Sequence, residues 1–208
     1  MLILPSIASG NLANPEREVS RLGNHPSLHF DVEDGNFVPN ITFGLKTIRA
    51  LRQVSGADFD AHLMVTNPAL YIPDLISLDF KGIAFHLEAV PYPLGLIQTI
   101  QEAGLRAGLA LNPKTGADEL LQYADVIDYV LLMATEPDGH GEHFQPRVLQ
   151  KIRKIKAAAP NLTLVVDGDI NAHTLPLAAQ AGAEVAVVGR GVFSAPDPVQ
   201  ALKEFSNF

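Results

Sequence analysis

The chain has 208 residues, of which 47% are hydrophobic, and a formal net charge of -8. This length and apolar content predict a single folded domain over residues 1–208, while the negative charge excludes nucleic acid and anionic membranes as expected partners. The chain has no cysteine, no basic start typical of a signal peptide and no apolar run long enough to span a bilayer, so we expect a cytoplasmic protein without disulfides.

Short apolar runs alternate with longer segments that have helical spacing. The runs predicted as strands are residues 2–8, 27–33, 58–65, 82–88, 106–112, 126–133, 162–168 and 184–189. Helices are predicted between them, clearest at residues 45–54, 96–104, 148–159 and 174–182; Gly104 and Gly182 lie where helix C-caps belong. Eight such units in about 200 residues predict an α/β fold, a single parallel (β/α)8 TIM barrel. An open doubly wound sheet is the alternative, which the lack of a Gly-rich turn after the first strand disfavours.

The predicted strand 27–33 carries polar side chains at every second position. Because strand side chains alternate, His29, Asp31 and Glu33 share one face, and large apolar residues occupy the other. An ordinary core face would be apolar, and a surface face would not be backed by a second apolar layer. The pattern therefore predicts a site that needs a nitrogen ligand and negative charge.

Polar residues also mark the C-terminal ends of other predicted strands. Together they are Ser6, His29, Asp31, His62, His86, Glu88 and Asp167. In a barrel these ends meet at one mouth, where the active sites of this fold lie. Two histidines and two aspartates form a plausible ligand set for zinc, iron or manganese rather than magnesium. The alternatives are a buried structural histidine for His62 and a turn or capping aspartate for Asp31.

Six segments in chain order carry a recognisable pattern. They are PSIASGN (5–11), HFDVEDGNFVPNITFG (29–44), DAHLMVTNP (60–68), HLEA (86–89), GLALNPKT (108–115) and VVDGDI (165–170). Together they resemble the ribulose-phosphate 3-epimerase family. The resemblance implies conversion of D-ribulose 5-phosphate to D-xylulose 5-phosphate, one divalent metal ion (zinc first; iron, manganese or cobalt otherwise) and a homo-oligomer, either a dimer or a hexamer.

The resemblance also assigns roles to residues of this chain. The implied metal ligands are His29, Asp31, His62 and Asp167. Asp31 and Asp167 are also the implied acid–base residues, while Ser6, Met64 and Met133 are expected to contact the substrate. Both methionines could equally be core residues. Two bases suit the inversion of a carbon next to a ketone, through an enediolate that the metal ion stabilises.

Three departures from the family concern its substrate pocket. Glu33 replaces a methionine, the loop after the sixth strand reads EPDGHGEHF (136–144) instead of a glycine-rich segment, and Asp169 and Arg190 replace a glycine and a small hydroxyl residue. The substrate contacts expected in these regions are Glu33, Asp138, Gly139, His140, Gly141, Gly168, Asp169, Gly189 and Arg190. Either the glycine N–H groups still bind phosphate, or Arg190 pairs with one or both aspartates and reshapes the pocket.

Three alternatives to the nominal reaction remain open at this point. The chain could be a 3-epimerase of a different ketose or ketose phosphate, such as a hexulose 6-phosphate. It could be a sugar-phosphate-binding relative that has lost turnover, which the complete His29, Asp31, His62 and Asp167 set argues against. A metal-dependent hydrolase on the same barrel has no separate support in the sequence.

Overall fold

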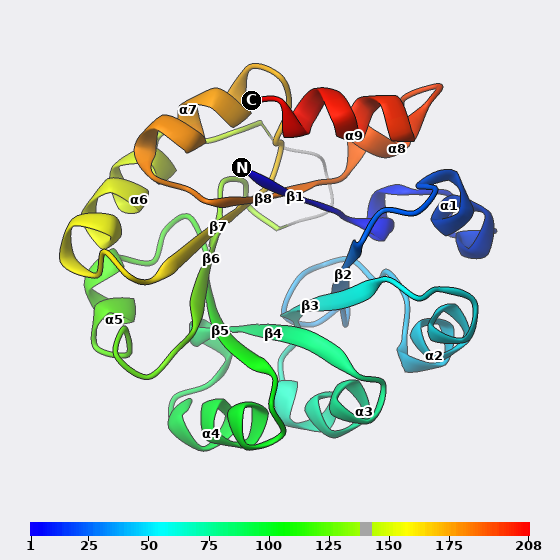
Figure 1. Cartoon of the computed structure of the whole chain (residues 1–208). Coiled ribbons are helices and arrows are strands. Elements are labelled where there is room, and N and C mark those ends of the chain that lie inside the picture. The colour runs from blue at the N-terminus through cyan, green and yellow to red at the C-terminus, as the bar shows by residue number, and fades with distance from the viewer. Residues whose placement is uncertain (138–142) are drawn as a thin grey trace.

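The computed structural model describes residues 1–137 and 143–208, and in them eight parallel strands form a barrel surrounded by helices (Figure 1). The strands are β1 (Leu2–Pro5), β2 (Ser27–Glu33), β3 (Asp58–Met64), β4 (Phe80–His86), β5 (Arg106–Leu111), β6 (Tyr129–Met133), β7 (Thr163–Asp167) and β8 (Val185–Val188). They are hydrogen-bonded in the order β1-β8-β7-β6-β5-β4-β3-β2. An isolated parallel bridge between Ser6 and His29 joins the two ends of this order. The predicted TIM barrel is therefore confirmed.

Helices follow the strands and cover the outside of the barrel (Figure 1). They are α1 (Pro15–Arg21), α2 (Leu45–Val54), α3 (Ile72–Ser77), α4 (Leu94–Glu102), α5 (Ala117–Leu121), α6 (Arg147–Ala158), α7 (Thr174–Ala181), α8 (Arg190–Phe193) and α9 (Pro198–Ser206), with short 3-10 turns at η1 (Ile7–Ser9), η2 (Pro68–Leu70) and η3 (Leu87–Ala89). Gly104 and Gly182 have φ values of +80° and +114°, so both glycines predicted to end helices adopt the left-handed conformation. Within the described residues, none of these helices is long and apolar enough to cross a membrane.

Two apolar layers hold the barrel together. The outer layer lies between strands and helices and includes Leu28 and Phe30 of β2 together with Ile48 of α2. The inner layer fills the barrel itself and consists of Leu4, Ala84, Ala110, Tyr129, Leu131, Met133, Val165, Val185 and Val187. Among the described residues, this inner cluster draws on every strand except β2 and β3. The inward positions of those two strands carry mainly polar residues instead, among them His29, Asp31, Asp60 and His62, and the site lies there.

Candidate metal and active site

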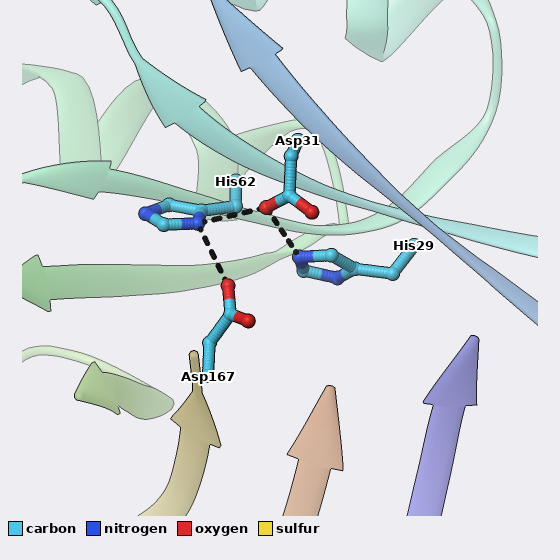
Figure 2. A group of neighbouring side chains, drawn as sticks. All are labelled: His29, Asp31, His62 and Asp167. Atoms are coloured by element: carbon cyan, nitrogen blue, oxygen red, sulfur yellow. Dashed lines mark hydrogen bonds and ion pairs between the residues drawn. The ribbon is translucent and has the colours of Figure 1, made fainter. Parts of the chain in front are cut away.

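Neighbouring strands bring the polar side chains of the site together. His29 and Asp31 point inward from β2, and the parallel register sets Asp31 of β2 opposite His62 of β3. Asp167 is the last residue of β7 and approaches from another side of the barrel (Figure 2). Both histidines are fully buried and Asp31 is nearly so. The barrel therefore gathers side chains from three strands at its C-terminal mouth.

The ligand atoms of this group are close enough to share one ion. His29, Asp31, His62 and Asp167 each offer one atom, and these atoms all lie within 4.8 Å of one another (Figure 2). His62 Nδ1 is 3.1 Å from Asp31 Oδ1 and 3.4 Å from Asp167 Oδ2. His29 Nε2 lies 3.4 Å from Asp31 Oδ1.

Within the described residues, one buried atom of this group makes no hydrogen bond to protein and has only the 3.4 Å contact with Asp31 Oδ1. His29 Nε2 is fully buried and has no hydrogen-bond partner among the described residues. A buried polar atom left without a partner costs about 1–3 kcal/mol, so such atoms are rare unless a ligand completes them. The atom faces the aspartates of the group, and two imidazoles with two carboxylates suit a divalent cation. The residues present therefore fit a metal ion, and the group could hold one.

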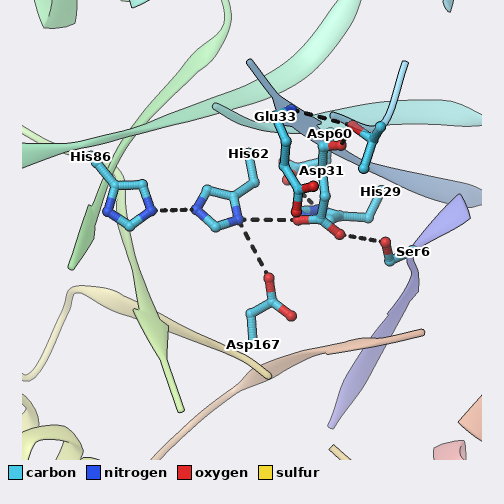
Figure 3. Close-up of polar contacts among 9 residues, drawn as sticks. Ser6, His29, Asp31, Glu33, Asp60, His62, His86 and Asp167 are labelled. Carbon is cyan, nitrogen blue, oxygen red and sulfur yellow. Dashed lines mark hydrogen bonds and ion pairs between the residues drawn. The ribbon is translucent and has the colours of Figure 1, made fainter. Parts of the chain in front are cut away.

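The second nitrogen of each histidine is also held. His29 Nδ1 is 3.1 Å from Asp60 Oδ1, and His62 Nε2 is 2.9 Å from His86 Nε2 (Figure 3). His86 Nδ1 in turn lies 3.0 Å from Glu88 Oε2. Partners of this kind fix the orientation and the tautomer of ligating imidazoles. The sequence marks His86 and Glu88 as polar residues at a strand end but assigns them no role, and it does not single out Asp60, which stands two residues before His62 on the same strand face.

The surrounding charges separate the pKa values of the two site aspartates. Burial alone would raise the pKa of Asp31, but the charges and hydrogen bonds of His29 and His62 outweigh it and hold that pKa well below its usual range. Burial and the negative charge of Asp31 raise the pKa of Asp167. The two carboxyls therefore differ in how readily they hold a proton, Asp167 more readily than Asp31. This is the division that a base and an acid working on one carbon require.

A pocket of about 190 Å³ opens beside the two aspartates. The other predicted substrate contacts that line it are Ser6, Gly168, Asp169, Gly189 and Arg190. The Ser6 hydroxyl donates a hydrogen bond to Asp31 Oδ2, so it also positions that carboxylate. Four further residues are predicted to contact the substrate: Asp138, Gly139, His140 and Gly141. They lie outside the described residues.

Three predicted contacts lie apart from the residues that line this pocket. Met64 and Met133 are buried near the ends of β3 and β6, and Met133 packs in the inner apolar cluster. Glu33 is partly exposed at the end of β2, where Asn40 Nδ2 donates to its Oε2 at 2.6 Å. Burial and the charge of Asp31 raise the pKa of Glu33 to about 7. The structure thus places Glu33 beside the site without making it part of the four-residue group.

The far end of the pocket contains an ion pair. Arg190 Nη2 donates to Asp169 Oδ1 at 3.0 Å, and the backbone N–H of Phe144 donates to Asp169 Oδ2 at 3.1 Å. Asp169 has a φ of +50°, in the left-handed region that a glycine adopts more readily. Gly168 has a φ of +105°, and a Cβ added to it would lie 2.8 Å from the backbone nitrogen of Thr135. The backbone is therefore tightly constrained where the substrate's tail is expected.

A nearly closed parallel barrel with a polar group and a pocket at its C-terminal mouth defines a TIM-barrel protein whose site has the position and composition of an enzyme active site. Comparison with known sequences narrows this class. The chain belongs to the ribulose-phosphate 3-epimerase family, whose sequence profile matches residues 2–193.

Curated relatives agree with this family over nearly the whole chain. The chain is 38% identical over 210 residues to the ribulose-phosphate 3-epimerase of Schizosaccharomyces pombe, covering 99% of this chain and 92% of that protein. It is 37% identical over 205 residues to the enzyme of the same name from Mycobacterium tuberculosis, covering 97% and 90%.

Solved structures show the same fold at much lower identity. A KGPDC from Streptococcus mutans in complex with D-R5P has a TM-score of 0.78 and 16% identity, covering 99% of this chain and 95% of that one. A 3-hexulose-6-phosphate synthase has a TM-score of 0.71 and 18% identity, covering 100% and 99%. At this low sequence identity, the structural similarity supports the barrel fold alone.

Proposed function

We propose that this protein is a metal-dependent 3-epimerase that interconverts D-ribulose 5-phosphate and D-xylulose 5-phosphate. The observation that carries the proposal is the buried group of His29, Asp31, His62 and Asp167 beside a pocket. Its curated relatives are named ribulose-phosphate 3-epimerases, which supports the same reaction for this chain. A chain that had lost turnover would not need two histidines and two aspartates kept in such close contact.

In this proposal the two aspartates exchange protons with carbon 3 of the substrate. Asp31 and Asp167 come from strands that β1 and β8 separate in the barrel, so they can approach one carbon from different directions. Asp31, whose pKa is lowered, would accept the proton from one face. Asp167, whose pKa is raised, would deliver one to the other, giving the epimer through an enediolate. The roles exchange in the reverse reaction.

The same four side chains would hold the cation. His29 Nε2, His62 Nδ1 and one oxygen from each aspartate are the atoms that face the shared position. A divalent ion bound there supplies Lewis-acid stabilisation of the negative charge that develops on the substrate oxygens. Zinc suits this ligand set best, and iron, manganese or cobalt are the alternatives.

The tail of the substrate would lie between the aspartates and Arg190. Gly168, Gly189 and Arg190 are proposed to contact its phosphate, with Ser6, Met64 and Met133 nearer the reacting carbon. Asp169 favours a second candidate, a 3-epimerase of another ketose phosphate, because its carboxylate lines the same pocket and opposes a phosphate. We also propose a cytoplasmic homo-oligomer; one relative, from rice, is named as a cytoplasmic isoform.

Proton exchange with solvent tests the reaction directly. The protein would be incubated in deuterium oxide with a panel of ketoses, each with and without its phosphate, before and after removal of metal by a chelator. We expect deuterium at carbon 3 of ribulose 5-phosphate, lost on chelation and restored by zinc. Exchange only with another ketose phosphate would favour the second candidate. Absence of exchange with every sugar, in protein that binds metal, would contradict the proposal.

A further inference from the structure

We propose that Glu88 is a positioning residue for the metal site and that it acts on His62 through His86. The three side chains form a continuous line from the partly exposed Glu88 to the four-residue group. Two contacts make the line: 2.9 Å from His62 Nε2 to His86 Nε2 and 3.0 Å from His86 Nδ1 to Glu88 Oε2. The inference depends on the proposed function only in taking the His29, Asp31, His62 and Asp167 group as the metal site.

The order of the protons along this line has one consistent solution. His62 Nδ1 is the nitrogen that faces Asp31 and Asp167, so it is the atom that would bind a cation and must then be unprotonated. The proton of His62 therefore sits on Nε2. Because two ring nitrogens 2.9 Å apart share a single proton, His86 Nε2 must accept it. The proton of His86 is left on Nδ1, where the Glu88 carboxylate accepts it.

Glu88 is itself held in place from a different part of the barrel mouth. Its Oε1 accepts the backbone N–H of Asn112 at 2.8 Å and the hydroxyl of Thr115. The ring of Phe37 packs against His86, with centroids 4.7 Å apart. Because carboxylate and ring are both fixed, Glu88 can select the tautomer of His86 and so the orientation of His62. Without the carboxylate, His86 could place its proton on Nε2, directly against the Nε2 proton of His62.

The two ligand histidines are thus supported in different ways. His29 Nδ1 contacts the carboxylate of Asp60 directly at 3.1 Å, and that side chain is 7% exposed. His62 Nε2 instead contacts His86, which in turn contacts the Glu88 carboxylate, and the Glu88 side chain at the end of the line is 23% exposed. Glu88 can therefore be changed with little disturbance of the core, whereas a change at Asp60 would also leave buried groups unpaired.

The first test compares the zinc affinity of the wild type with that of Glu88→Gln, each measured by competition with a chelator. We expect binding to weaken by about 10- to 100-fold, the range typical when a partner of a metal-ligating side chain is lost. Thr115→Val keeps the Glu88 charge but removes one of its hydrogen bonds, so it should give a smaller loss. Glu136→Gln is the matched control, because Glu136 is similarly exposed at 26% and pairs with Arg147 rather than with a histidine. Its zinc affinity should stay within about twofold of wild type, since a rim charge is largely screened by solvent.

Histidine tautomers give a second readout that needs neither substrate nor turnover. Nitrogen-15 spectra of the zinc-bound protein, labelled at its 7 histidines, should show the proton of His62 on Nε2 and that of His86 on Nδ1. In Glu88→Gln the His86 signal should shift towards a mixture of tautomers. A wild-type His86 protonated on Nε2, unchanged zinc affinity in Glu88→Gln, or an equal loss in Glu136→Gln would each overturn the inference. If the wild-type protein does not exchange the carbon 3 proton of any ketose with solvent, the proposed epimerase activity is contradicted. The proposed role of Glu88 is not affected by that result.

Discussion

The inner and outer ends of the pocket differ in how strongly the protein fixes them. At the inner end, His29 and His62 are fully buried and Asp31 and Asp167 are 12–13% exposed at the side chain, with charged partners on several sides. At the outer end, Arg190 is 56% exposed and pairs with Asp169. Charge interactions are strong in a dry interior and weak at a solvated surface, where an ion pair contributes about 0–1 kcal/mol. The proposed acid–base and metal-binding residues are therefore held by several buried contacts, while the residues proposed to recognise the substrate make contacts that are easier to change.

Removing either of the proposed acid–base carboxyls at the inner end should have the largest effect. We expect Asp31→Asn and Asp167→Asn each to lower kcat by about 10³-fold or more, because general acid–base catalysis is typically worth 10²–10⁴-fold and each residue is also a proposed ligand. Steady-state kinetics on ribulose 5-phosphate measures this. Each variant should keep proton exchange only with the epimer whose proton faces the remaining carboxyl. Near-normal turnover in either variant would mean that the bases are others.

Removing a proposed ligand should abolish metal binding along with activity. His62→Ala is expected to weaken zinc binding by more than about 100-fold, beyond the loss typical of residues that only support a ligand. Metal content after dialysis, measured by elemental analysis, checks this result. His173→Ala, at an exposed histidine, serves as the control. Full activity of His62→Ala without bound metal would break the proposed link between the inner end and catalysis.

A change at the outer end should affect recognition rather than chemistry. Arg190→Ala is expected to raise KM for a phosphorylated ketose by tenfold or more, since losing a charge-assisted contact costs about 1.5–3 kcal/mol. The value of kcat should change much less. Asp169→Asn is the paired variant, and removing its negative charge should lower KM for the same substrate. If Arg190→Ala leaves KM unchanged, the ion pair has no part in binding phosphate.

The smallest effect is expected from Glu33, which lies beside the inner end. Its folded-state pKa is raised from 4.5 to about 7, so between these values the native protein holds a proton that the unfolded chain has released. Stability therefore falls as pH rises through this window, and the full penalty is present above about pH 7. Glu33→Gln should raise the free energy of unfolding of the metal-free protein at about pH 8 by on the order of 1 kcal/mol, less than the full pKa shift implies, because solvent screens this partly exposed carboxylate. Near pH 4 the gain should disappear, and urea unfolding that shows the same gain at both pH values would contradict the assignment.

Strands with a clear alternation of polar and apolar residues could be predicted more accurately than uniformly apolar ones. Strand β2 was predicted at residues 27–33 and lies at Ser27–Glu33, because its alternation of polar and large apolar residues leaves a single register. Strand β6 was predicted from residue 126 but begins at Tyr129, since the N–H of Val126 is bonded to the carbonyl of Tyr123 in a turn. An apolar run alone does not distinguish a turn from a strand. The short helices, such as α3 and α5, have too few turns for a clear hydrophobic period.

The four residues of the candidate metal site could be named from the sequence, because histidines and aspartates are rare inside a barrel and the resemblance to the family implies them as ligands. The contacts that support them could not be predicted. Asp60 shares the inward face of His62, and His86 and Glu88 stand at a strand end, but the contacts that link them depend on how neighbouring strands align. The pairing of Arg190 with Asp169 joins two loops from different strands, which no local pattern encodes. That pairing was one of two alternatives the sequence left open, and its effect on substrate binding stays a prediction.

Anomalous diffraction from crystals soaked in zinc would show whether His29, Asp31, His62 and Asp167 bind one metal ion. The proposal predicts one strong peak between the four side chains, with His29 Nε2, His62 Nδ1 and one oxygen each of Asp31 and Asp167 at about 2.0–2.2 Å from it. Diffraction data collected at X-ray energies above and below the zinc absorption edge would distinguish zinc from other ions. A peak elsewhere in the molecule, with these four side chains apart and unliganded, would contradict the account.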